Sequence, residues 1–93
     1  MEFLLCRNRV ADFARWKAVF DSHASAHRAA GLRLLHLWRA VPDPDDVFFL
    51  FRVESVARAR EFLDAPEAAE AGRVAGVIGG EYHLLESVQG YGD

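Results

Sequence analysis

Two strongly apolar runs flank a polar turn in the middle of the chain and predict a β-hairpin. The runs occupy residues 32–40 and 47–53, and the turn at residues 41–46 holds two prolines and three aspartates, which favour tight turns. Neither run alternates between apolar and polar residues, as a strand with one solvated face should. We therefore expect both faces of the sheet to be covered, one by helices and the other by a second copy of the chain.

Helical periodicity flanks this hairpin on both sides. Between residues 10 and 30, aromatic residues and histidines recur every three or four positions, which predicts one long helix. Asp12 is its candidate N-cap, and Gly31 ends it as a residue in the left-handed region would. Ser55 is expected to cap a second helix, and Pro66 to open a third, because proline is tolerated only in the first helical turn.

Two shorter apolar segments, residues 1–8 and 81–88, predict the first and the last strand of the chain. Residues 76–80 carry three glycines and are expected to form a flexible connection, and the tail at residues 89–93 is expected to be loose. The element order is then βαββαβ with a split second helix. This order predicts a single α+β domain over residues 1–93 with the ferredoxin-like arrangement, a four-stranded antiparallel sheet with helices on one face and the first and third strands central.

Composition excludes several classes of function. The chain has a net charge of −3 and a single lysine, whereas nucleic-acid binding requires a clustered basic face. No segment approaches the roughly 20 apolar residues of a membrane span, and the single Cys6 cannot form an internal disulfide, which fits a reducing cytoplasm. Hydrophobic residues form 52% of only 93 residues, and such a small chain buries a modest core, which favours a homodimer.

The hairpin register decides which residues share a face. If paired positions sum to 87, Arg33 lies opposite Glu54, and cross-strand pairs of opposite charge are favoured. One face then carries aromatic residues and is expected to meet the helices, while Arg39 points away from them. A shift of one residue would exchange the two faces. The residues of the aromatic face are His36, Trp38, Phe49 and Phe51.

A pocket between this face and the first helix would have aromatic walls and a few polar groups, as small-molecule sites commonly do. His36 and His23 are the candidate catalytic bases, since histidine titrates near neutrality. The alternative is a filled aromatic core with the histidines at its rim. The candidate substrate-binding residues are Trp16, Phe20, His27, Trp38, Phe49 and Phe51.

His23 and His27 are four residues apart, a spacing that also occurs in metal sites on helices. His36 or His83 could complete a histidine-rich site. However, Ala24 stands where a metalloprotease helix carries glutamate, and nothing else in the sequence converges on a third ligand. We therefore expect neither a metal nor another cofactor.

Several motifs together resemble one superfamily. They are Asp12-Phe13-x-x-Trp16-Lys17-x-x-Phe20-Asp21-x-His23, then Gly31, then DPDDVFFLFRVES, then ARAREFLDAPE. The chain resembles the dimeric α/β-barrel superfamily, and within it the small bacterial proteins of the antibiotic-biosynthesis-monooxygenase-like or cyclase-like type.

This resemblance implies two ferredoxin-like protomers packed sheet to sheet. It also implies a cofactor-independent monooxygenase or cyclase that acts on an aromatic or polyketide-like small molecule. The alternative is a non-catalytic dimeric protein that binds a ligand or is purely structural, and the sequence leaves the choice between enzyme and non-enzyme open.

Overall fold

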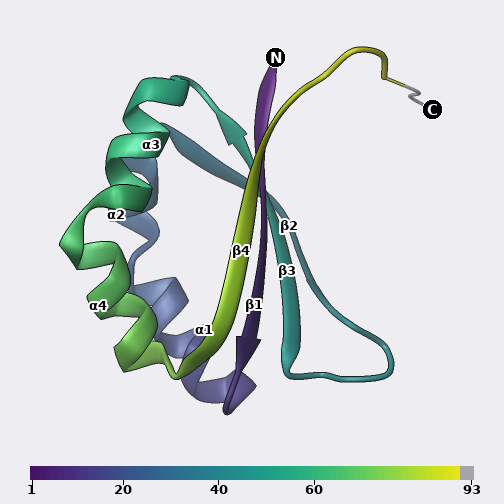
Figure 1. Cartoon of the computed structure of the whole chain (residues 1–93), viewed down its shortest axis with the longest axis vertical. Coiled ribbons are helices and arrows are strands. Elements are labelled where there is room, and N and C mark those ends of the chain that lie inside the picture. Colours follow the sequence, from purple (N-terminus) through teal and green to yellow (C-terminus); the bar gives the residue numbers. More distant parts are fainter. Residues whose placement is uncertain (91–93) are drawn as a thin grey trace.

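The computed structural model describes residues 1–90, so the last three residues of the predicted loose tail lie outside the described part. Within these residues, four strands and four helices are formed, and one pair of helices precedes the hairpin while another pair follows it along the chain (Figure 1). In order they are β1 (Glu2–Val10), α1 (Phe13–Ser22), α2 (Ala24–Ala29), β2 (Leu32–Arg39), β3 (Asp46–Val53), α3 (Val56–Asp64), α4 (Pro66–Ala75) and β4 (Val77–Glu86).

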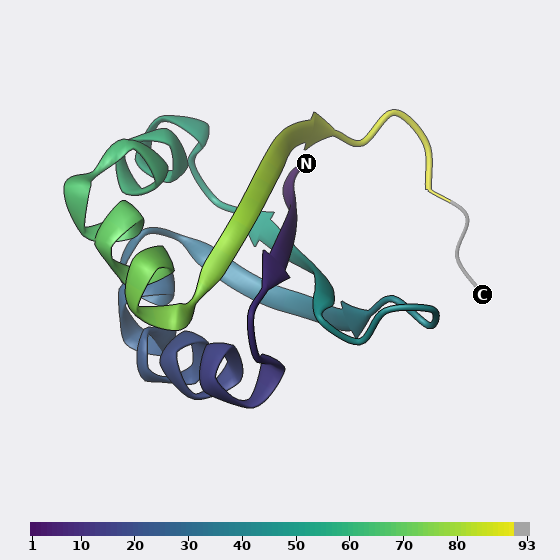
Figure 2. The ribbon, with the colours of Figure 1, turned by 60° about the horizontal axis from the view of Figure 1, so that its bottom comes forward.

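The strands form one antiparallel sheet in the order β2-β3-β1-β4. The first and third strands are therefore central, and all helices lie on one side of the sheet in both ribbon views (Figure 1 and Figure 2). This confirms the predicted ferredoxin-like α+β fold. We call the side that faces the helices the inner face of the sheet and the opposite side the outer face.

Short polar residues and glycines set the helix boundaries as the sequence predicted. The side chain of Asp12 accepts a hydrogen bond from the backbone of Arg15 at 3.0 Å, and Ser55 caps α3 in the same way. Pro66 is the first residue of α4, and Gly31 has a positive φ of 76°.

The predicted single helix over residues 10–30 is instead two helices that meet at His23. The Nδ1 atom of His23 lies 2.8 Å from the carbonyl of Val19, and the hydroxyl of Ser22 donates to the same carbonyl at 2.6 Å. Side chains that bind a carbonyl of the preceding turn compete with the backbone ladder. This local competition explains why the helix breaks there.

The two outer segments of the chain form longer strands than predicted. β1 extends to Val10, and β4 begins at Val77 rather than at residue 81, so the expected flexible connection was wrong. Gly79 and Gly80 pair with Arg9 and Asn8 of β1. Backbone pairing with a central strand outweighs the weak strand propensity of glycine.

The predicted hairpin register was also wrong. Leu34 lies opposite Phe51, a sum of 85, and the sum becomes 86 from His36 onwards because Leu35 forms a bulge. Arg33 consequently lies opposite Arg52 and not opposite Glu54. A bulge inserts one unpaired residue and changes which face the following side chains take.

The bulge reverses the prediction for the second half of β2. His36 and Trp38 lie on the outer face, with their rings stacked at 4.9 Å between centroids, whereas Phe49 and Phe51 face the helices as predicted. Arg39, predicted to point away from the helices, lies over the ring of Phe13 in α1 at 3.9 Å.

The core lies between the inner face and the helices. Its largest fully buried side chains are Trp16, Leu4, Leu32 and Val47. No helix within residues 1–90 combines the length and the apolar character that a membrane crossing requires.

Candidate functional site

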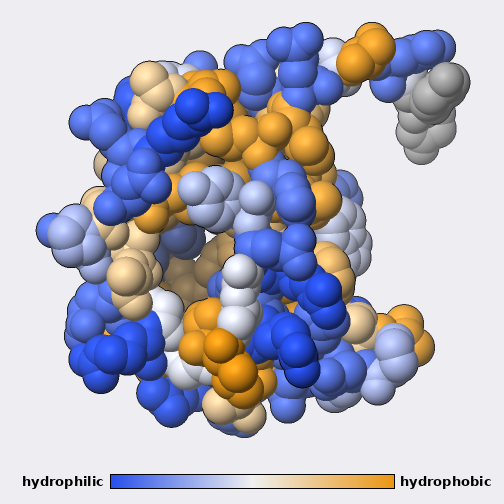
Figure 3. All heavy atoms as spheres, in the orientation of Figure 1, coloured by the Kyte–Doolittle hydropathy of each residue, from blue (hydrophilic) through white to orange (hydrophobic). Residues whose placement is uncertain are grey.

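A cavity of about 710 Å³ lies between the inner face of the sheet and the helices. Strands β1, β3 and β4 form one wall, α1 and α2 form a second, and α3 and α4 close the third side. The space-filling view shows a hollow between the α4 column and β4, with apolar residues at its floor (Figure 3). Its volume falls in the range of small-molecule sites, about 300–1,000 Å³.

The residues predicted from the sequence to form the site lie on both faces of the sheet. Six of the eight line the cavity: Trp16, Phe20, His23, His27, Phe49 and Phe51. The other two, His36 and Trp38, lie across the sheet on the outer face, so the prediction that they face the helices was wrong. The physical cause is the bulge at Leu35, which the sequence did not reveal.

Aromatic rings pack into one continuous wall of the cavity. Trp16 is only 2% exposed and stacks on Phe20 with centroids 4.7 Å apart. Phe49 contacts both rings, at 5.5 Å and 5.1 Å, and Phe51 continues the row. Such a wall favours planar aromatic ligands, because offset stacking and edge contacts add to the burial of apolar surface.

His27 is the polar group most deeply set among these rings. Its ring lies 5.1 Å from Phe20, 5.1 Å from Phe51 and 5.6 Å from Phe62. Within residues 1–90 its ring nitrogens make no hydrogen bond, and neither counts among fully buried polar atoms, so they keep some access to solvent. Because His27 lines the cavity, these nitrogens are available to a ligand hydroxyl.

Burial, with a smaller effect of the nearby His23, lowers the pKa of His27 from 6.5 to about 4. Desolvation disfavours the charged imidazolium. His27 is consequently neutral at physiological pH and offers one acceptor and one donor nitrogen.

The same shift predicts a pH dependence of stability. Between pH 6.5 and 4 the unfolded chain binds the His27 proton more tightly than the folded protein, so stability is full above pH 6.5 and falls towards pH 4. We expect a loss of roughly 1–2 kcal/mol, because His27 keeps some contact with solvent. Urea unfolding of wild type and His27→Leu over this range isolates the effect from titrating carboxylates. Parallel pH profiles for the two proteins would contradict it.

His23 lines the same cavity at the break between α1 and α2. Its Nδ1–H donates to the carbonyl of Val19 at 2.8 Å, which leaves Nε2 as the unprotonated nitrogen in the neutral ring. A backbone acceptor that fixes the tautomer in this way also orients the ring. His23 thus presents a defined proton acceptor, while His27 presents a desolvated one whose pKa is lowered by burial.

Sequence reasoning missed several lining residues. Asn8 follows Leu4 and Cys6 in the alternation of β1 and so faces the cavity, a polar position that strand periodicity alone could have indicated. Phe62 comes from α3, and α4 contributes mostly small side chains along with Glu67 and Arg73, so much of its wall leaves space for a ligand. The small residues of that wall are Ala68, Ala69, Ala71, Gly72 and Ala75.

Cys6 lies buried on the cavity wall, as the sequence predicted for a small hydrophobic residue. Burial raises the pKa of its thiol to about 12, so the thiolate is not formed at neutral pH. Within residues 1–90 no group of three or more His, Cys, Asp or Glu side chains is arranged to hold a metal ion.

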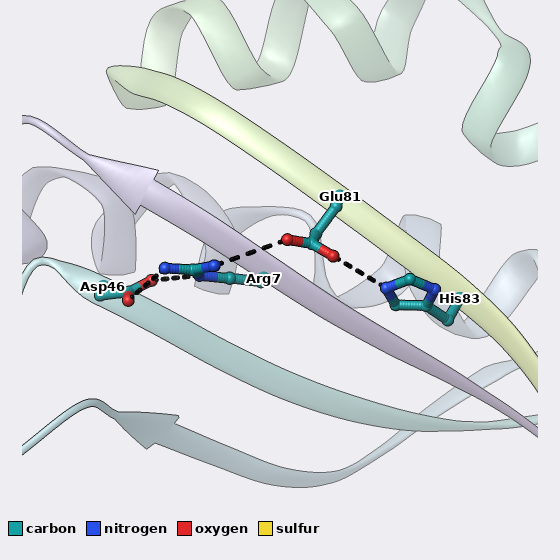
Figure 4. Close-up of polar contacts among 4 residues, drawn as sticks. All are labelled: Arg7, Asp46, Glu81 and His83. Atoms are coloured by element: carbon teal, nitrogen blue, oxygen red, sulfur yellow. Dashed lines mark hydrogen bonds and ion pairs between the residues drawn. The ribbon is translucent and has the colours of Figure 1, made fainter.

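The outer face carries a chain of polar contacts on the opposite side of the sheet (Figure 4). Arg7 forms two 2.8 Å hydrogen bonds with Asp46 and lies 3.6 Å from Glu81, which accepts from His83 at 2.8 Å. The Arg7 guanidinium lowers the pKa of the Asp46 carboxyl. The network crosses three strands and lies beside exposed apolar residues.

Comparison by sequence finds no matching family model and no matching curated protein. Comparison by structure finds clear similarity. A mutant of SnoaB, a cofactor-independent oxygenase from Streptomyces nogalater, is 18% identical, covers 99% of this chain and 97% of its own, and has a TM-score of 0.77.

A provisionally named antibiotic biosynthesis monooxygenase from Bordetella bronchiseptica is 15% identical, covers 95% of this chain and 97% of its own, and also has a TM-score of 0.77. A similarly named protein from Deinococcus radiodurans is 13% identical, covers 100% of this chain and 98% of its own, and has a TM-score of 0.75. This chain therefore has the fold of the antibiotic-biosynthesis-monooxygenase-like proteins. At these identities the similarity is one of fold.

Proposed function

We propose that this protein, which shares its fold with SnoaB and other antibiotic-biosynthesis-monooxygenase-like proteins, is a cofactor-independent oxygenase or cyclase. Its substrate would be a planar aromatic or polyketide-like molecule that bears a hydroxyl group. The observation that carries the proposal is a cavity of about 710 Å³ that combines a continuous aromatic wall with two histidines.

The two histidines suit different roles in such a reaction. His23 Nε2 is free to accept a proton from a phenol or an activated carbon, because Nδ1 is held by the Val19 carbonyl. Neutral His27 can hydrogen-bond the substrate hydroxyl and so orient the ring system against Phe20 and Phe51. The resulting substrate anion would react with dioxygen or condense internally.

Oxygen uptake in the presence of hydroxylated polycyclic aromatics tests this proposal. We expect wild type to consume oxygen, His23→Gln to lose about 10²–10⁴-fold in rate while it still binds the substrate, and His36→Ala to match wild type. His36 serves as the control because it lies on the outer face. An equal loss of rate in His23→Gln and His36→Ala would contradict the assignment of His23 as the base.

A non-catalytic ligand-binding protein is the alternative, and the same cavity favours it over a purely structural protein with a filled core. Binding of 1-naphthol, measured by calorimetry, with neither oxygen uptake nor any conversion of hydroxylated aromatic or polyketide-like compounds would select this alternative. Failure to bind any aromatic compound would refute both functions.

We also propose that a second copy of the chain covers the outer face of the sheet. Six apolar side chains gather there, and monomers rarely expose a contiguous apolar surface of this kind. They are Phe3, Leu5, Trp38, Phe48, Leu50 and Leu85, which we call the outer apolar patch.

Charge supports a second copy as the occupant. At one end of the outer face Arg33 lies directly opposite Arg52, and within residues 1–90 neither makes an ion pair. At the other end lie Asp46 and Glu81, which share Arg7, together with Arg9. A twofold axis across the strands would set Arg33 and Arg52 of one copy over this mixed network, whose carboxylates could also accept from them, since an isologous interface pairs each surface with itself reversed.

A further inference from the structure

The side-chain amide of Asn8 makes a hydrogen bond within the protein at each of its two ends. Its oxygen accepts a hydrogen bond from the indole N–H of Trp16 at 3.2 Å, and its nitrogen donates to the backbone carbonyl of Arg7 at 3.0 Å. Asn8 lies on the cavity wall. One N–H and one lone pair of the amide stay free, but the two bonds fix its plane, so it acts on the cavity mainly by orienting Trp16.

Trp16 is the side chain that this amide orients. The indole is almost fully buried and stacks on Phe20 with an interplanar angle of 21°. A buried indole N–H requires an acceptor, and Asn8 supplies it. A displaced amide would leave this donor unpaired or would force the ring plane to turn.

Gly80 of β4 lies directly opposite Asn8 across the β1–β4 pairing. A Cβ atom at Gly80 would lie 2.8 Å from the Asn8 amide and 3.4 Å from the Arg7 carbonyl, so the amide would have to move. At the neighbouring Gly79 a Cβ would meet no heavy atom within 4 Å. The two glycines are adjacent in one strand, but only Gly79 has room for a Cβ atom.

We propose that Gly80 is a specificity-determining position of the cavity. The missing side chain keeps the Asn8 amide in place, and the amide fixes the plane of Trp16, which stacks behind Phe20 and so sets the aromatic wall that flat ligands meet. This inference rests on the proposed function, since it assigns the preference of the same cavity. Asn8 and Gly80 are positioning residues, and Trp16 is the buried ring that they position behind Phe20.

The test uses a Trp38→Phe background, in which Trp16 is the only tryptophan and its emission can be read alone. Binding of two probes is measured by calorimetry: 1-naphthol, which is flat, and decahydro-1-naphthol, which has the same skeleton but cannot stack. We expect Gly80→Ala to shift the emission of Trp16 and to weaken 1-naphthol binding by about tenfold. A tenfold change in affinity corresponds to the net contribution of about one hydrogen bond. Binding of decahydro-1-naphthol should change less than about twofold, since apolar burial is non-directional.

Gly79→Ala is the matched control and should leave the emission and both affinities unchanged. A double-mutant cycle identifies the route of the effect. Once Asn8→Ala has removed the amide, adding Gly80→Ala should change the emission of Trp16 no further, because the clashing group is gone. This double variant also restores space if Gly80→Ala alone folds poorly.

Three results would overturn the inference. One is a Gly80→Ala protein that matches Gly79→Ala in both emission and 1-naphthol affinity. Another is an equal loss of affinity for both probes, which would indicate general damage to the cavity. The third is full additivity of Asn8→Ala and Gly80→Ala. If wild type binds neither probe, the proposed function fails, whereas the emission of Trp16 still decides whether Gly80 positions the indole.

Discussion

Replacing Trp16 with alanine is expected to destabilise the folded protein by about 3–5 kcal/mol. The indole is 2% exposed, stacks on Phe20 and contacts Phe13 and Phe49. Its removal forfeits this packing and leaves the Asn8 amide without the indole N–H. Small domains have a total stability of about 5–15 kcal/mol, so the variant would be marginal. Thermal and urea unfolding should both detect the change.

Trp16→Phe is the graded control at the same site. It retains a ring against Phe20 but loses the indole N–H and part of the volume, so we expect a smaller loss of about 1–2 kcal/mol. If Trp16→Ala were as stable as wild type, the ring would contribute no packing energy, and its position would be open cavity space. In that case Trp16 would not be part of the core.

The order and type of the elements could be predicted because their signals are local. Asp12, Ser55, Pro66 and Gly31 each act within one turn of the chain, and all four mark helix boundaries in the structure. The break at His23 is also local, but it depends on which carbonyl the imidazole reaches, and residue spacing does not reveal that choice.

The faces of the second half of β2 could not be predicted, because both faces of the hairpin are apolar. When inward and outward positions carry the same kind of residue, hydrophobic pattern specifies register only weakly. The bulge at Leu35 then moved His36 and Trp38 to the outer face while it left Leu34 opposite Phe51. An ion pair between Arg33 and Glu54 was a reasonable criterion, but Glu54 instead lies 3.8 Å from Arg58 of α3.

Part of the cavity could be predicted, since Trp16, Phe20, His23 and His27 form a stripe on one side of the first helical region. The rest comes from elements distant in sequence. Asn8 and Gly80 become neighbours only through the β1–β4 pairing, and the volume itself depends on the small side chains that α4 presents. The identity of the lining therefore follows from tertiary structure, whereas its aromatic character follows from the sequence.

The doubly apolar hairpin that indicated a dimer has one covered face in the structure, and the outer apolar patch remains. Leu50 lies at its centre, opposite Leu5 of β1 and His36 of β2. If a second copy packs over this position, a carboxylate there would lose its hydration and would gain no positively charged partner. Burial of an uncompensated charge at an interface costs about 2–5 kcal/mol or more.

Leu50→Glu is therefore expected to convert a dimer into a monomer of about 10.4 kDa, with the dissociation constant raised at least about a hundredfold. Sedimentation at micromolar protein measures this directly. Val41→Glu is the matched control, because it adds the same charge at a hairpin-turn residue that is 98% exposed. Wild type that sediments only as a monomer would refute the proposed assembly, and Leu50→Glu that remains dimeric would place the interface elsewhere. Retention of the aromatic cavity in the Leu50→Glu monomer, tested with 1-naphthol, would further separate assembly from ligand binding, since the two lie on opposite faces of one sheet.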